Sequence, residues 1–71
     1  MQPEDLHAIR DRTRAAWITR RACGLVGIAA TLRIERIIAL DGAGRLRRED
    51  ALRMAREAEA VALCFPPLPW L

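Results

Sequence analysis

The stretch LVGIAATLRIERIIAL, residues 25–40, decides the fold class of this chain. Its dense apolar content is typical of a buried helix, but its second half is also rich in β-branched side chains. As a strand it would place Arg36 on the same face as the apolar residues. As a helix it gathers one apolar stripe, made of Ala30, Ile34, Ile37 and Ile38. We therefore predict a helix over 26–39, with a β-hairpin around residues 34–47 as the alternative.

The residues before this stretch predict another amphipathic helix, over 3–23. Pro3 suits the first helical position, Glu4 and Asp5 suit the positive end of the helix dipole, and Gly24 is able to end the helix. At 100° per residue its apolar side chains fall within a narrow arc. They are Leu6, Ile9, Thr13, Ala16 and Trp17.

The residues after the stretch predict a turn and a third helix. The turn is Asp41-Gly42-Ala43-Gly44, and the helix runs over 47–64, where Pro66 and Pro67 stop it. Its apolar stripe recurs every three or four residues. The stripe consists of Ala51, Met54, Ala55, Ala58, Val61, Ala62 and Phe65. Because much of it is alanine and it is complementary to itself, we expect the stripe to mediate self-association.

These elements predict an all-α fold, a small bundle of about three helices with an extended, proline-rich C-terminal arm. We expect residues 1–65 to form a single small helical domain and residues 66–71 to form the arm. The arm resembles a polyproline II ligand, but so small a core needs apolar cover. We therefore expect the arm to fold back over the domain through Leu68, Trp70 and Leu71.

Size and charge both point to partners. A chain of 71 residues rarely gains more than about 3 to 5 kcal/mol from its core alone, so association is an expected source of further stability. All 12 basic residues are arginine and the net charge is +3, which favours anionic partners. Five arginines lie within residues 10–21 beside a single acid, whereas four acids and two arginines lie within residues 49–71. Contact between two copies is one way to satisfy both charge patterns.

The composition argues against an enzyme. Without Ser, Asn, Lys or Tyr, the chain has no Ser nucleophile, Schiff-base lysine or tyrosine acid. On one continuous helix His7 and Cys23 would lie about 24 Å apart, too far for joint catalysis. We expect no cofactor.

No metal site is expected either. The spacing of Cys23 and Cys64 suits no zinc site, and we expect both to be buried and reduced. The loop 41–50 resembles an EF-hand loop, but alanines stand at 39 and 43, where that family has acids.

Location is predicted from the apolar run 22–32 and the first residues. Eleven residues are too few to cross a bilayer, so we expect no membrane association. The early acids Glu4 and Asp5 are unlike those of a secretory signal, so we expect a cytoplasmic chain.

The strongest functional candidate is a ridge of Arg10, Arg14, Trp17 and Arg21, whose spacing of four, three and four makes each a neighbour of the next on one helix. Guanidinium groups beside an indole suit carboxylates or phosphates. The alternative is that Trp17 belongs to the core and the arginines form its solvated border.

The function predicted is that of a small, non-enzymatic regulatory module, an inhibitor or adaptor, which binds a protein partner and self-associates as a homodimer. The alternative is a regulator that binds nucleic acid through the arginine-rich first helix or a degenerate helix-turn-helix at residues 22–38. That segment follows the small, apolar, Gly, apolar order of the motif. However, it has Arg33 and Arg36 where the motif needs buried apolar side chains.

Overall fold

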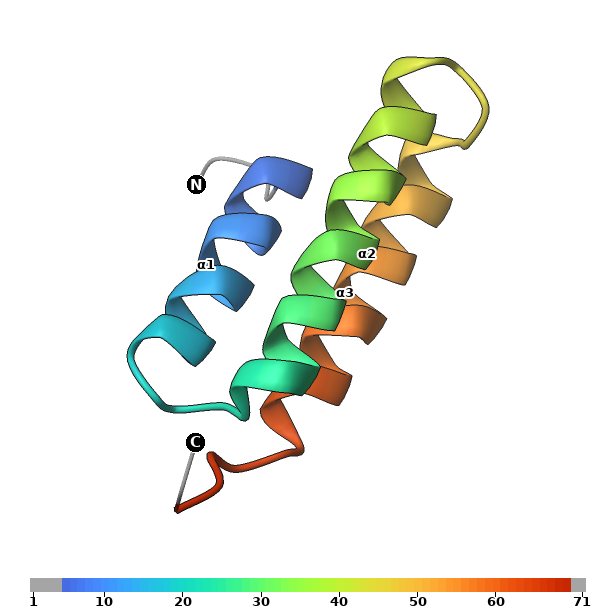
Figure 1. The fold of residues 1–71 in the computed structure, drawn as a ribbon. Helices are drawn as coiled ribbons and strands as arrows, with labels where there is room; N and C mark the ends of the chain where they lie inside the picture. Colours follow the sequence, from blue (N-terminus) through green and yellow to red (C-terminus); the bar gives the residue numbers. More distant parts are fainter. Residues whose placement is uncertain (1–4, 70–71) are drawn as a thin grey trace.

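The computed structural model describes residues 5–69 and contains three helices and no strand within that range (Figure 1). The helices are α1 (Leu6–Ile18), α2 (Gly24–Gly42) and α3 (Arg48–Leu63). The predicted all-α bundle is confirmed. Because α2 continues to Gly42, the hairpin alternative at 34–47 is wrong. A helix-turn-helix at 22–38 is also wrong, because residues 24–42 form one helix without a turn.

Each helix runs antiparallel to the next, and every pair of helices is in contact (Figure 1). The α1–α2 connection and the residues after α3 lie at one end of the bundle, and the α2–α3 connection lies at the other. Helix α1 is the shortest, so the α2–α3 hairpin extends beyond it. The molecule is therefore elongated, with extents of 41 × 26 × 15 Å.

The core lies where the three helices meet, and α3 contributes to it almost entirely through alanine. Ile9 and Ile34 are the most deeply buried large side chains. The whole cluster is Leu6, Ile9, Ala30, Ile34, Ile37, Ala51, Ala55, Ala58 and Ala62. The four alanines of α3 belong to the stripe predicted for self-association, and all four are buried within the single chain. Small side chains there allow the helices to approach closely.

Helix α1 ends earlier than predicted, at Ile18 rather than Cys23. Arg20 adopts a left-handed backbone conformation with φ of 63°, and the Arg20 and Arg21 amides donate to the carbonyl oxygens of Trp17 and Ala16. This is the Schellman arrangement, in which glycine is the usual residue at the left-handed position. The chain therefore reverses at a non-glycine residue, and Gly24 begins α2 instead of ending α1.

The connection between α2 and α3 uses the same geometry with the expected residue. Gly44 has φ of 72°, and the amides of Gly44 and Arg45 donate to the carbonyls of Asp41 and Leu40. The chain reverses at the predicted turn, but Asp41 and Gly42 still belong to α2, so the turn begins at Ala43.

Ion pairs join helices that are distant in sequence. Arg12 of α1 forms a two-point interaction with Glu59 of α3, in which Nη2 lies 2.6 Å from Oε1 and Nε donates to Oε2. Glu59 is buried, whereas the Arg12 side chain is half exposed. Arg48 of α3 pairs with Asp41 of α2 at 3.1 Å beside the connection. The Arg12–Glu59 pair therefore links α1 to α3, and the Arg48–Asp41 pair links α3 to α2.

Candidate protein-binding surface

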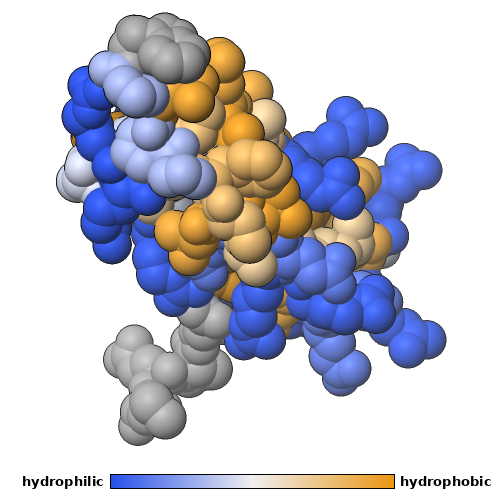
Figure 2. Space-filling view, turned by 90° about the horizontal axis from the view of Figure 1, so that it is seen from below, coloured by the Kyte–Doolittle hydropathy of each residue, from blue (hydrophilic) through white to orange (hydrophobic). Residues whose placement is uncertain are grey.

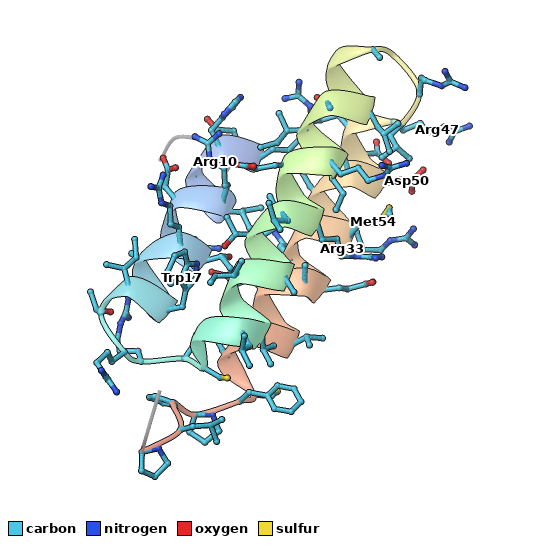
Figure 3. All side chains as sticks on the ribbon, viewed as in Figure 1. Arg10, Trp17, Arg33, Arg47, Asp50 and Met54 are labelled. Carbon is cyan, nitrogen blue, oxygen red and sulfur yellow. The ribbon has the colours of Figure 1, made fainter. Side chains whose placement is uncertain are left out.

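Trp17 is held in a fixed position between α1 and α2. It lies in the last turn of α1, and its indole N–H donates to the Thr31 hydroxyl at 3.1 Å. The hydroxyl in turn donates to the Gly27 carbonyl at 2.8 Å. Gly27 has no side chain, and a Cβ there would lie 2.5 Å from the Trp17 Cβ. Trp17 therefore packs directly on the backbone of α2, with only part of the side chain exposed (Figure 3).

A groove runs along the α1–α2 seam on both sides of this tryptophan. One hollow of about 420 Å³ and a second of about 330 Å³ share Trp17 and Ile28 on their walls, so they are neighbours. We call this surface the Trp17 groove. Its apolar walls are Trp17, Ile18, Ile28 and Leu32, and its charged border is Arg14, Arg20 and Glu35.

The apolar walls of the Trp17 groove are unusually exposed for residues of their size. Leu32 is 60% exposed and Ile18 is 54% exposed, and Ile28 is also exposed. Leu25 precedes Ile28 and Leu32 at helical spacing and is exposed as well. Single exposed apolar residues are common, but a contiguous group around a hollow is typical of an interaction surface.

Exposed apolar residues are concentrated at one end of the bundle. Viewed from that end, hydrophobic residues run across the middle of the surface and hydrophilic residues lie on both sides of them (Figure 2). The large exposed apolar residues near this end are Ile18, Leu25, Ile28, Val61, Leu63 and Phe65. The opposite end carries charged residues around the α2–α3 connection, including Arg45, Arg47 and Glu49. The Trp17 groove thus opens on the apolar part of the molecule.

The predicted arginine ridge is only partly present. Arg10, Arg14 and Trp17 lie on α1, but Arg21 lies beyond its end, and the Arg21 Nε donates to the Thr19 hydroxyl at 3.0 Å. Arg10 pairs with Asp11 at 3.1 Å. Arg14 and Trp17 border the groove. Of the four predicted ridge residues, Arg14 and Trp17 therefore belong to the Trp17 groove, a surface that the prediction did not describe.

The predicted self-association stripe of α3 is divided between core and surface. Ala51, Ala55, Ala58 and Ala62 are buried. Val61 and Phe65 are about half exposed, and Met54 is partly buried. A contact between two folded copies would therefore involve mainly Val61, Phe65 and Met54 of this stripe.

The predicted C-terminal arm is only partly described. Residues 66–69 form no helix, and the Cys23 amide donates to the Phe65 carbonyl at 2.8 Å. Pro67 and Leu68 are half-buried and line the Trp17 groove. Trp70 and Leu71 lie outside the described residues, so the complete arm stays a prediction.

The two cysteines have different surroundings. Cys23 is buried, as predicted, but Cys64 is exposed, so the prediction that both are buried is wrong for Cys64. Cys64 follows the last turn of α3, where the chain leaves the bundle. Within residues 5–69 no three His, Cys, Asp or Glu side chains come close enough to hold a metal ion.

Sequence reasoning missed most of the Trp17 groove. Ile18, Ile28, Leu32, Arg20 and Glu35 were not among the predicted site residues. A signal was present, because Leu25, Ile28 and Leu32 follow each other at steps of three and four on a side of α2 that does not face the core. Two apolar stripes on one helix indicate that one of them is available to another molecule.

Comparison with known proteins gives no family for this chain. No protein-family model matches it, and neither a curated protein nor a solved structure is significantly similar to it. No helix among residues 5–69 has both the length and the apolarity to span a bilayer. Functional inference therefore depends on the surface itself.

Proposed function

We propose that this chain is a non-enzymatic interaction module that binds a protein partner in the Trp17 groove. The observation that carries the proposal is the exposure of Ile18, Ile28 and Leu32 around a fixed tryptophan. Burying such a group on a partner removes apolar surface from water, which is the main favourable term in protein association. Tryptophan with a border of arginine is also a composition enriched in binding hot spots.

The charges at the border indicate what kind of segment fits. Arg14 and Arg20 are exposed and form no ion pair with another described residue, and Glu35 is the acid among them. Two unpaired arginines against one acid favour an acidic partner. The occupant we propose is a helical segment with an apolar stripe and acidic flanking residues, laid along the seam.

The groove fits a protein better than a nucleic acid. The indole N–H is bonded to Thr31, and the ring packs on Gly27, so Trp17 is not free to stack on a base. Leu32 and Ile28 offer apolar contacts where a phosphate backbone needs cations. Glu35 would repel a phosphate that approached this part of the seam.

The proposal is tested with a phage-displayed library of random 16-residue peptides selected on the immobilised chain. We expect enriched peptides to combine apolar residues at helical spacing with acids. Leu32→Asp should weaken their binding by about tenfold or more, because it places a charge in the apolar wall. The matched control is Leu63→Asp, since Leu63 is similarly exposed, at 53%, and lies outside the groove.

Fluorescence anisotropy of a labelled peptide measures these affinities, and circular dichroism verifies that both variants are folded. Failure to enrich any peptide would overturn the proposal, as would peptides that bind Leu32→Asp as tightly as the unmodified chain. A duplex DNA probe is included. Tight binding of this probe that weakens steeply with salt would replace the protein partner with a nucleic acid.

A further inference from the structure

A second groove lies along the seam between α2 and α3, and α1 contributes no wall to it. Its volume is about 330 Å³. We call it the alanine groove. Its apolar lining is Val26, Ala29 and Ala30 of α2 with Ala58 and Val61 of α3, and its charged residues are Arg33 of α2 and Glu57 of α3. None of these residues lines the Trp17 groove.

The alanine groove is hollow because its lining is small. Ala30 and Ala58 form a buried floor, whereas Val61 is 53% exposed at the edge. Two of its residues, Ala58 and Val61, belong to the stripe predicted for self-association. Close helix approach at alanine leaves room above the floor for side chains from another helix.

The two walls of the alanine groove carry opposite charges. Arg33 and Arg36 on α2 are exposed and make no ion pair with another described residue. On α3, Glu57 and Asp50 are acidic, and both lie near Arg53 of the same helix, at 4.0 Å and 3.5 Å. Figure 3 shows Arg33, Asp50 and Met54 at the same edge of the bundle. Among the residues that line the groove, the α2 wall therefore carries the positive charge of Arg33 and the α3 wall carries the negative charge of Glu57.

We propose that the occupant of the alanine groove is a second copy of this chain, related by a two-fold axis parallel to the helices. Such an axis places α2 of one copy against α3 of the other at the same level along the bundle. Arg33 and Glu57 line one hollow from opposite walls, so each meets its opposite charge in the partner copy.

The alternative two-fold axis, perpendicular to the helices, fits the charges less well. It places α2 against α2 and α3 against α3, so that the basic walls face each other and the acidic walls face each other. Juxtaposed like charges disfavour that pairing. In the arrangement we propose, every helix of the α2–α3 layer is antiparallel to its neighbours, as in an antiparallel four-helix bundle. Val26 and Val61 of both copies fill the centre.

This inference goes beyond the proposed function, since it assigns a different groove to a different occupant. The test uses charge reversal and its compensation. Sedimentation equilibrium at up to ~100 μM measures the dimer dissociation constant of the full chain and its variants. We expect a dimer, and we expect Arg33→Glu alone and Glu57→Arg alone to raise the dissociation constant by about tenfold each. The double variant R33E/E57R should regain most of the lost affinity, because both pairs re-form with reversed sign.

Matched controls are Arg45→Glu and Glu49→Arg, which make the same charge changes at exposed positions outside the groove. Neither should alter association by more than about twofold. Val61→Asp is a further variant at an exposed position, so it keeps the fold and should abolish the dimer. A chain that is monomeric at 100 μM overturns the inference. A dimer that ignores R33E and E57R, or a double variant as weak as the singles, overturns it as well.

Discussion

Replacing Gly27 by alanine should destabilise the fold because this glycine lies where Trp17 and α2 meet. An added Cβ would lie 2.5 Å from the Trp17 Cβ and 2.7 Å from both Cγ and Cδ1. Overpacking of this kind costs about 1–3 kcal/mol, and three such contacts with a hydrogen-bonded ring favour the upper value. Alanine returns about 1 kcal/mol through its greater helix propensity. The net loss we expect is about 2 kcal/mol.

Thermal and urea unfolding, followed by circular dichroism, measure this loss. In a domain of this size, 1 kcal/mol shifts the melting temperature by about 4–8 °C, so Gly27→Ala should lower it by about 8–16 °C. Gly42→Ala is the matched control in the same helix, since a Cβ there meets nothing within 4 Å. That variant should be as stable as the unmodified chain or more stable, through helix propensity.

A Gly27→Ala variant as stable as Gly42→Ala would refute the close approach of Trp17 to α2. A second substitution locates the cause. Trp17→Ala keeps the Cβ at 2.5 Å and should not relieve the clash fully, whereas Trp17→Gly removes all three close atoms. In a Trp17→Gly background, Gly27→Ala should therefore cost nothing further.

Three further predictions concern the helix connections and the thiols. Arg12→Leu alone leaves Glu59 buried without its Arg12 partner and should cost about 1–3 kcal/mol in urea unfolding, while R12L/E59L should lose less than the two single changes summed. Arg20→Gly should raise the free energy of unfolding by about 1 kcal/mol, since glycine adopts the φ of 63° without strain; no gain would contradict the left-handed geometry. An aromatic disulfide reagent should label Cys64 at once and Cys23 only after denaturation, and equal rates for both thiols would contradict the burial of Cys23.

The three helices could be predicted because their signals are local. In residues 25–40, helical periodicity gathers an apolar stripe without an arginine, whereas strand alternation does not. The structure places Ala30, Ile34 and Ile37 of that stripe in the core. The predicted third helix differs from α3 by one residue at each end. Periodicity and proline both act over a few residues, so a single sequence contains enough information to place these elements.

The end of α1 could not be predicted in the same way. Arginine rarely adopts φ of 63°, so no residue preference marks position 20 as the reversal. Tertiary contacts hold the chain reversal at Arg20. Cys23 bonds to Phe65 at the far end of the chain, and Trp17 is fixed by Thr31 and Gly27 of the next helix. Such contacts outweigh a local cost of about 1–2 kcal/mol.

The sequence could not predict which residues of the α3 stripe are buried and which are exposed, again because tertiary contacts decide this. An alanine stripe indicates close packing, but it does not say whether the neighbouring helix belongs to the same chain. Here α1 and α2 of the same chain cover Ala51, Ala55 and Ala62, and only the Ala58–Val61 edge remains along a groove. The Arg12–Glu59 pair was missed because its partners are 47 residues apart and no spacing rule joins them.

The two proposed associations are compatible, because they use different sides of helix α2. Ala30, Ile34 and Ile37 face the core, Ile28 and Leu32 face the Trp17 groove, and Val26, Ala29 and Arg33 face the alanine groove. A second copy on the alanine groove therefore leaves the Trp17 groove of each copy open. The proposed dimer therefore carries two Trp17 grooves, one from each copy. A partner with two binding segments would occupy both and gain avidity without any new contact. The monomeric Val61→Asp variant should consequently keep its affinity for a single peptide, because Val61 lies outside the Trp17 groove, and it should lose the additional affinity for a tandem peptide.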